Sequence, residues 1–151
     1  MHKLIMLLAL AAVAVASGAV PASASTPEPV AIAMNGHFTG PNTVAGTWSA
    51  SGAFTDSGTY TETFRIEGQS IHGEKVLVGT KGTLVLNAQG VVVFLTPTTV
   101  TFKAGSWEIV DGTGAYERLH AGGTPAGTPD SFADLATDVI HITHAGDAHD
   151  D

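Results

Sequence analysis

The clearest candidate for acid–base chemistry is Glu62, which alternates with large apolar side chains in a segment typical of a β-strand. Tyr60, Phe64 and Ile66 are spaced to share its face. If this face points into the protein, burial disfavours the ionised carboxylate and suits Glu62 to giving and taking protons. If the face is the outer one, or if Glu62 lies at a rim, the carboxylate is only solvated. The sequence leaves both interpretations open.

A second group of chemically capable residues lies near the end of the chain, where His141, His144, Asp147 and His149 follow one another closely. Imidazole and carboxylate groups are ligands that Zn, Cu and Ni accept. On a strand, His141 and His144 would point to opposite faces, whereas on a loose segment all four could converge. The pattern predicts a solvated acidic tail over residues 146–151, and a metal site is the alternative.

Other chemistries lack the residues that they need. The chain has no cysteine, which excludes a thiol nucleophile, a disulfide and a Cys-based zinc site. Ser51 and Ser57 each precede a glycine but do not form a Gly-x-Ser-x-Gly elbow, and the Gly-Thr-Gly at residues 112–114 has no phosphate-loop lysine. The 14 acidic against 6 basic residues, a net charge of −8, argue against nucleic acid as a partner. We expect no cofactor and favour a protein that is not an enzyme; if it is one, we expect an isomerase or cyclase.

The elements that must position these residues are predicted to be β-strands. Apolar residues recur with period two in short runs rich in Thr, Val and aromatic residues, separated by Gly, Asn or Asp turns. We therefore predict an all-β fold, a single antiparallel β-barrel of about eight strands over residues 30–145, because closure removes exposed strand edges. Such a barrel either fills its interior with side chains or holds one small ligand. The residues expected to line the interior and bind such a ligand are Trp48, Tyr60, Phe64 and Trp107.

Two segments depart from the strand pattern. Residues 112–119, GTGAYERL, predict one short helical turn that packs on the core as a plug. Residues 131–135 predict a short turn or helix, because the apolar positions that begin there have a period close to 3.6. A closing strand is expected to follow at residues 139–142.

The beginning of the chain does not fit the barrel. After a short basic start, residues 4–16 are uninterrupted and apolar, too few for a membrane span of ~20 residues but typical of a secretory signal. The small residues that follow predict cleavage after Ala24, so that residues 1–24 are a signal peptide and residues 25–29 a flexible lead-in. An uncleaved membrane anchor is the alternative. We expect a secreted or extracytoplasmic protein with no membrane span after cleavage.

One stretch of the chain resembles a known family. The residues that carry the resemblance are glycines, aromatics and a leucine at fixed spacing, namely Gly105, Trp107, Gly112, Gly114, Tyr116, Leu119 and Gly122. Their pattern resembles that of secreted bacterial proteins with an allene oxide cyclase-like β-barrel, which is related in shape to dirigent proteins. The resemblance implies a barrel in which these residues are structural. The plant cyclases act on an unsaturated fatty-acid epoxide with a polar constellation that includes a cysteine, which this chain lacks, so the resemblance does not carry their activity over.

Three functions are compatible with these features. The first is a secreted, non-catalytic barrel that binds a small apolar molecule. The second is an isomerase of the allene oxide cyclase type that uses Glu62, and the third is an exported metal-binding protein. An open apolar lumen with Glu62 facing into it would favour the second over a filled barrel, whereas a packed lumen would weaken both ligand-binding interpretations. Assembly into a homo-oligomer is compatible with the sequence.

Overall fold

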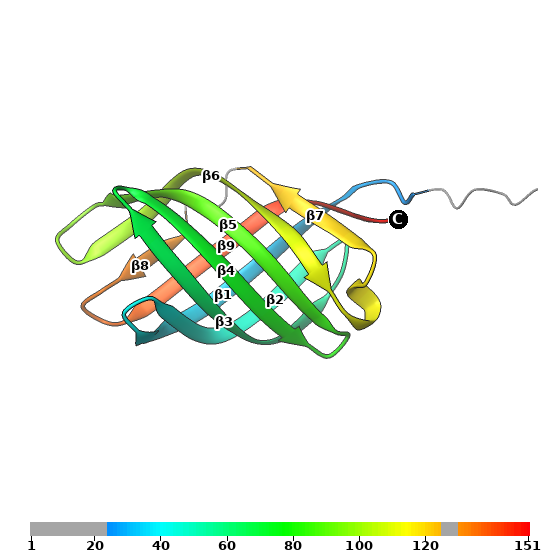
Figure 1. Ribbon diagram of the computed structural model, residues 1–151, viewed down its shortest axis with the longest axis horizontal. Helices are drawn as coiled ribbons and strands as arrows, with labels where there is room; N and C mark the ends of the chain where they lie inside the picture. The colour runs from blue at the N-terminus through cyan, green and yellow to red at the C-terminus, as the bar shows by residue number, and fades with distance from the viewer. Residues whose placement is uncertain (1–23, 125–129) are drawn as a thin grey trace, which may run out of the picture.

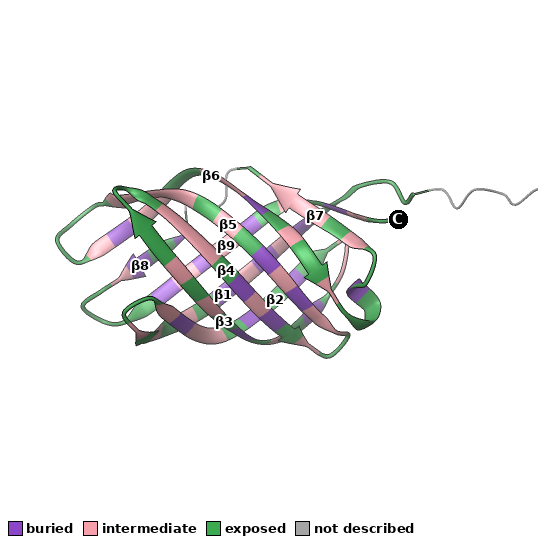
Figure 2. Ribbon diagram, in the orientation of Figure 1, coloured by how far each residue is buried: buried purple, intermediate pink, exposed green. Residues whose placement is uncertain are grey.

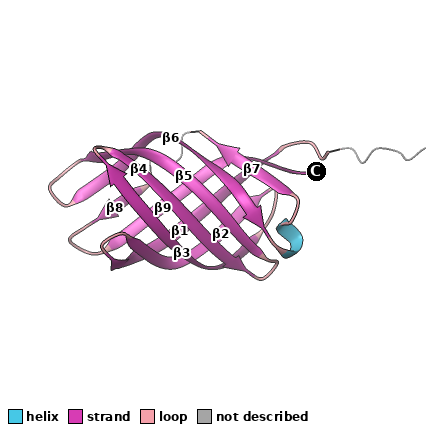
Figure 3. Cartoon of the chain, in the orientation of Figure 1, coloured by secondary structure: helices cyan, strands magenta, loops and turns pink. Residues whose placement is uncertain are grey.

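The computed structural model describes residues 24–124 and 130–151, so the predicted signal peptide lies, except for Ala24, outside the described residues. Strands make up most of this part, and a single 3-10 turn is its helical element (Figure 3). In chain order the elements are β1 (Glu28–Gly40), β2 (Thr43–Gly52), β3 (Asp56–Glu67), β4 (Ser70–Gly79), β5 (Thr83–Phe94), β6 (Thr99–Gly112), η1 (Gly114–Tyr116), β7 (Leu119–Gly123), β8 (Phe132–Asp134) and β9 (Val139–Asp150).

The strands form a closed antiparallel barrel of eight strands with one additional short strand, β8 (Figure 1). Each strand from β1 to β6 pairs with the next along the chain, and β9 returns to pair with β1 and close the barrel. Both β7 and β8 pair with β6 and with β9: β7 does so near one end of the barrel and β8 near the other. The predicted antiparallel barrel with one helical turn is confirmed.

Alternation along the strands separates a lumen from an outer face (Figure 2). The most deeply buried apolar side chains point inward from different strands and include Ile32, Met34, Leu77, Leu84 and Leu86. Because the strands run up and down, their turns fall alternately at two ends. The β1–β2, β3–β4, β5–β6 and β8–β9 turns lie at one end, here named the open end, on the left of Figure 1. The other turns, η1 and the end of β9 lie at the opposite, closed end.

The closed end is held by one buried carboxylate, that of Asp56 at the start of β3. It accepts hydrogen bonds from the hydroxyl groups of Tyr116 (2.6 Å) and Thr80 (2.7 Å) and from the backbone N–H groups of Ser57, Thr80 and Lys81. Burial by itself raises the pKa of Asp56, but the hydrogen bonds outweigh it and hold the pKa well below its usual range. The carboxylate thus joins β3, the β4–β5 turn and η1.

The predicted plug is therefore present at this end. Tyr116 is buried and its ring packs on Phe54 at a centroid distance of 5.3 Å. Gly114 begins η1 with a φ of 61°, in the left-handed region where glycine carries no steric penalty. The chain can turn sharply there and return Tyr116 to the barrel end.

Two segments near the end of the chain differ from their sequence-based descriptions. Residues 131–135 do not form a helical turn, because Ala133 pairs its backbone with β6 and β9 and Phe132–Asp134 is the strand β8. An apolar period read over so few residues could not separate the two states. Residues 146–150, predicted as the start of an acidic tail, continue β9 and pair with β1 and β7. Ala148 is buried within this stretch.

Candidate functional site

A cavity of about 270 Å³ occupies the half of the lumen nearest the open end. Its wall is mostly apolar, and large side chains from five strands contribute to it: Phe38, Phe64, Val92, Phe102, Ile140 and Ile142. The space exists where three inward positions of β4 and β5, next to the filled half, carry small residues: Gly73, Ala88 and Gly90. In the closed half the same two strands place Leu77, Leu84 and Leu86 inward, and the lumen is filled.

An ion pair interrupts the apolar wall. Glu62 on β3 lies directly opposite Lys75 on β4 in the strand register, and the Lys75 Nζ is 2.6 Å from the Glu62 Oε2. The two side chains are only 13% and 6% exposed, and both line the cavity. Removing such charges from water is costly, and their attraction offsets that cost only while both partners are present.

Gly73 leaves the carboxylate of this pair uncovered. A Cβ atom added at Gly73 would lie 3.3 Å from the Glu62 carboxyl carbon and 3.4 and 3.5 Å from its two oxygens. Any larger residue at this inward position would therefore lie against the carboxylate. With glycine there, Glu62 faces both its lysine partner and the open space of the cavity.

Tyr60 lies next to the pair, and His144 is a further polar residue of the cavity wall. Tyr60 is buried one inward position deeper than Glu62 on β3, and burial together with the negative charge of Glu62 raises the pKa of its hydroxyl above the usual range. His144 on β9 is buried and lines the cavity, with its ring stacked on Trp107 at 5.6 Å. The Trp107 Nε1 donates a hydrogen bond to the Ala145 carbonyl oxygen (2.9 Å), which fixes the indole beneath that imidazole.

The structure brings together some of the predicted lining residues and not others. Glu62 shares an inward face with Tyr60, Phe64 and Ile66, which settles the choice between the inner and outer face left open by the sequence. Phe64 lines the cavity as expected. Trp48, Tyr60 and Trp107 instead belong to the packed core and are absent from the cavity wall.

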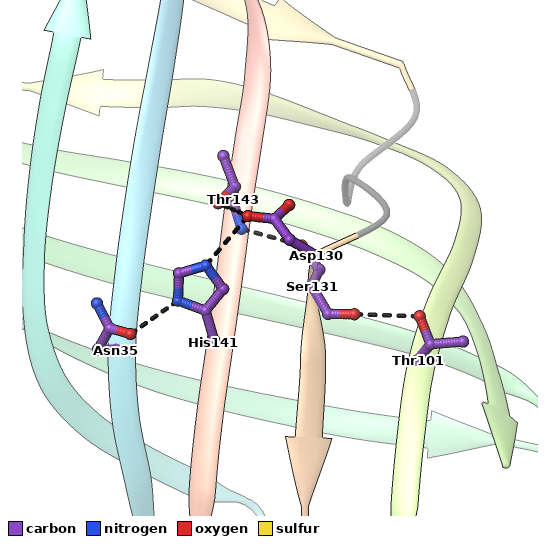
Figure 4. Close-up of polar contacts among 6 residues, drawn as sticks. All are labelled: Asn35, Thr101, Asp130, Ser131, His141 and Thr143. Carbon is purple, nitrogen blue, oxygen red and sulfur yellow. Dashed lines mark hydrogen bonds and ion pairs between the residues drawn. The ribbon is translucent and has the colours of Figure 1, made fainter. Parts of the chain in front are cut away.

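The four predicted metal ligands do not form one site. His144 points into the lumen, while His141 lies on the other face of β9 with its ring nitrogens 2.7 Å from the Asn35 Oδ1 and 3.3 Å from an Asp130 oxygen (Figure 4). Asp147 is exposed, and the His149 ring stacks on that of His120. In the described residues, no group of three or more His, Cys, Asp or Glu is arranged to hold a metal ion.

The contacts around His141 belong to a polar network, here named the seam, that joins four strands. Its residues are Asn35, Thr101, Asp130, Ser131, His141 and Thr143. The Ser131 carbonyl oxygen accepts a hydrogen bond from the Thr101 hydroxyl (3.1 Å), and the Ser131 hydroxyl accepts one from the Thr143 backbone N–H (3.0 Å). Figure 4 shows these groups between β1, β9, β8 and β6. The seam links β8 and the residues just before it to the barrel wall.

Lys75 is the site residue that strand alternation alone does not identify. Two faces of β4 could point inward. One carries Lys75 and Leu77, and the other, more apolar face carries Val76 and Val78. The signal that identifies Lys75 is the hairpin register. Counting outward from the turn at Gly68 and Gln69 places it opposite Glu62, and a buried lysine is acceptable when it is paired.

Comparison of the chain with protein-family models, with curated proteins and with solved structures finds no match in any of the three. The resemblance of residues 105–123 to allene oxide cyclase-like barrels therefore stays a prediction. Within residues 24–124 and 130–151, no helix has the length and apolar character needed to cross a membrane.

Proposed function

We propose that the protein is a non-catalytic β-barrel that binds one small, largely apolar molecule in the open half of its lumen. The observation that carries this proposal is the cavity itself, whose wall is mostly apolar and which ends among the turns of the open end. Its 270 Å³ lies just below the ~300–1,000 Å³ of pockets for drug-sized molecules. At ~30 Å³ for each water-sized group, it holds roughly nine non-hydrogen atoms.

Titration calorimetry with toluene and 1-octanol tests this proposal. Ala88→Leu places a larger side chain at an inward position of the cavity wall, and we expect it to abolish binding of both probes. The matched control is Ala145→Leu, at an exposed position on β9, which should bind as the natural sequence does. Absence of binding to the natural protein, or equal binding by Ala88→Leu, would contradict the proposal.

A second candidate function is an isomerase, and one observation favours it. Glu62 faces an open apolar cavity, the arrangement in which a lumenal carboxylate could act on a bound molecule. Glu62 would serve as the base and the Lys75 ammonium as the acid. Incubation with an unsaturated fatty-acid epoxide, followed by product analysis, tests it. Conversion no faster with the natural protein than with Glu62→Gln would remove this candidate.

We also propose that the protein is exported, because residues 4–16 and the small residues after them have the pattern of a cleaved secretory signal. Resemblance to secreted allene oxide cyclase-like proteins supports the same location. The barrel needs no disulfide for this role, since eight strands close on themselves and their backbone groups pair within the sheet.

A further inference from the structure

We propose that the lumen selects an uncharged ligand with one hydroxyl or carbonyl group, which lies against Glu62 and Lys75 while the apolar remainder extends toward the open end. The inference rests on the proposed ligand-binding function and specifies its ligand. It excludes, as preferred ligands, both carboxylates and amines of the same size.

The charges of Glu62 and Lys75 disfavour a charged ligand. Glu62 and Lys75 together have no net charge, and their Nζ–Oε2 distance of 2.6 Å joins them directly. A bound carboxylate would lie beside the Glu62 carboxylate, and a bound ammonium beside the Lys75 ammonium. Either ligand adds an unbalanced charge to an apolar cavity, where an ion without a partner is strongly disfavoured.

The pair retains hydrogen-bonding capacity for a polar group of an uncharged ligand. An ammonium has three donors and a carboxylate about four acceptor sites, so neither group is exhausted by one contact between them. A ligand hydroxyl can donate to Glu62 and accept from Lys75, and a carbonyl can accept from Lys75 alone. Gly73 leaves the carboxylate open to the cavity, because any Cβ there would lie 3.3 Å from its carbon.

The position of the pair sets the orientation of the ligand. Along β3 the inward residues from the rim inward are Ile66, Phe64 and Glu62, so the pair lies four residues from the rim, or about 13 Å at ~3.3 Å per residue. Exposed apolar side chains surround the mouth, among them Ile66, Phe94 and Leu135. A polar group at the pair therefore leaves the apolar chain between Phe64 and this rim.

Two other titratable side chains line the cavity in the described structure. Lys103 is exposed near the open end, and His144 is stacked on Trp107. Lys103 offers an alternative in which a carboxylate stays at the mouth with its chain pointing inward. The experiment must therefore separate binding at the pair from binding at Lys103.

Calorimetric titrations of the natural protein at pH 8 with 1-octanol, octanoate, octylamine and toluene make that separation. The three octyl probes are similar in size and differ in charge, and toluene is an uncharged probe without a polar group. We expect 1-octanol to bind at least tenfold more tightly than either ion, a difference of about 1.4 kcal/mol. Lys103→Gln is the matched control, because it removes a cation from the same cavity without touching the pair, and it should leave the ratio of 1-octanol to octanoate affinity unchanged.

Variants of the pair should redirect the preference. Glu62→Gln leaves the Lys75 charge unbalanced and should raise octanoate affinity relative to 1-octanol at least tenfold. Lys75→Met leaves the Glu62 charge unbalanced and should raise octylamine affinity relative to 1-octanol at least tenfold. The double variant Glu62→Leu with Lys75→Met removes both charges, so that it decides the matter even if the single variants do not fold. It should weaken 1-octanol about tenfold and leave toluene unchanged.

The outcomes separate this inference from the function on which it rests. If none of the four probes binds, the ligand-binding proposal itself fails. The inference is wrong if toluene and 1-octanol bind but octanoate binds as tightly as 1-octanol. It is also wrong if the double variant keeps the full affinity for 1-octanol. In either case the Glu62–Lys75 pair does not determine which ligand the lumen binds. If octanoate binds tightly and Lys103→Gln abolishes that binding, the ligand enters in the opposite orientation and the inference is also wrong.

Discussion

Removing one hydrogen bond from Asp56 should measurably weaken the barrel. Tyr116→Phe deletes the hydroxyl that lies 2.6 Å from the carboxylate and leaves the ring in place. Hydrogen bonds to charged groups contribute about 1.5–3 kcal/mol. Thr80, Lys81 and Ser57 still donate to the carboxylate, so it is not left unpaired. We expect a loss of about 2 kcal/mol in the free energy of unfolding, measured by urea titration at pH 7.

Asp56→Asn should cost more and should make the cost depend on pH. One side of the new amide would direct its NH₂ at groups that are themselves donors, so we expect a loss of about 3 kcal/mol or more at pH 7. The folded-state pKa of Asp56 lies below its ordinary value near 3.8. The stability contributed by the ionised group is therefore fully present above that value and is lost as the pH falls below it. The difference between the natural protein and Asp56→Asn should be constant from pH 7 to 5 and shrink below about pH 4.

A second Asp→Asn exchange provides the control. The Asp111 carboxylate is exposed and accepts the neighbouring Gly112 N–H (2.9 Å), so Asp111→Asn should change stability by less than about 0.5 kcal/mol. The explanation given for Asp56 is refuted if Tyr116→Phe is as stable as the control. It is also refuted if the loss in Asp56→Asn is the same at pH 3 as at pH 7.

Three other outcomes can be checked separately. Glu62→Gln should lower the free energy of unfolding by about 3–5 kcal/mol, because it leaves the Lys75 charge buried alone, while Glu62→Leu with Lys75→Met should stay within about 1 kcal/mol of the natural protein; equal urea midpoints for the two variants would contradict this. Gly114→Ala should cost about 1–2 kcal/mol, since the φ of 61° is unfavourable for residues with a Cβ, and an unchanged thermal midpoint would show that η1 adapts. N-terminal sequencing of the exported protein should begin at Ser25, and retention of residues 4–16 would favour a membrane anchor.

The barrel could be predicted from the sequence because the alternation typical of a β-strand recurs many times along the chain. Many short runs with period two, separated by turn residues, all point to one architecture. Alternation does not decide which face is inward, however, when both faces carry apolar residues. On β4 the valines at 76 and 78 compete with Leu77, and Leu77 is the fully buried one. Lys75 lies on the Leu77 side, and its burial is understandable only after Glu62 is placed opposite it.

The elements near the end of the chain were harder to predict for a different reason. Strand β8 has three residues and no pattern of its own, so it exists only because β6 and β9 offer backbone groups on both sides. The spacing of the His and Asp residues near the chain end is compatible with a solvated tail and, alternatively, with a metal site. Their positions in a paired strand place His144 inward and His141 outward, which keeps the imidazoles apart.

The placement of the two described chain ends has a practical consequence. The Ser25 backbone N–H donates to the Asp150 carbonyl oxygen (2.9 Å), and the Asp150 N–H donates to the Ser25 hydroxyl (2.7 Å). Both residues lie at the closed end, where β1 begins and β9 ends, and the C mark on the right of Figure 1 shows this end of the barrel. A purification tag, a fluorophore or a surface linker fused at either position would therefore project away from the cavity mouth. Immobilised protein should present every mouth to the solution, so that ligand capture can be measured on a sensor surface without obstruction by the attachment.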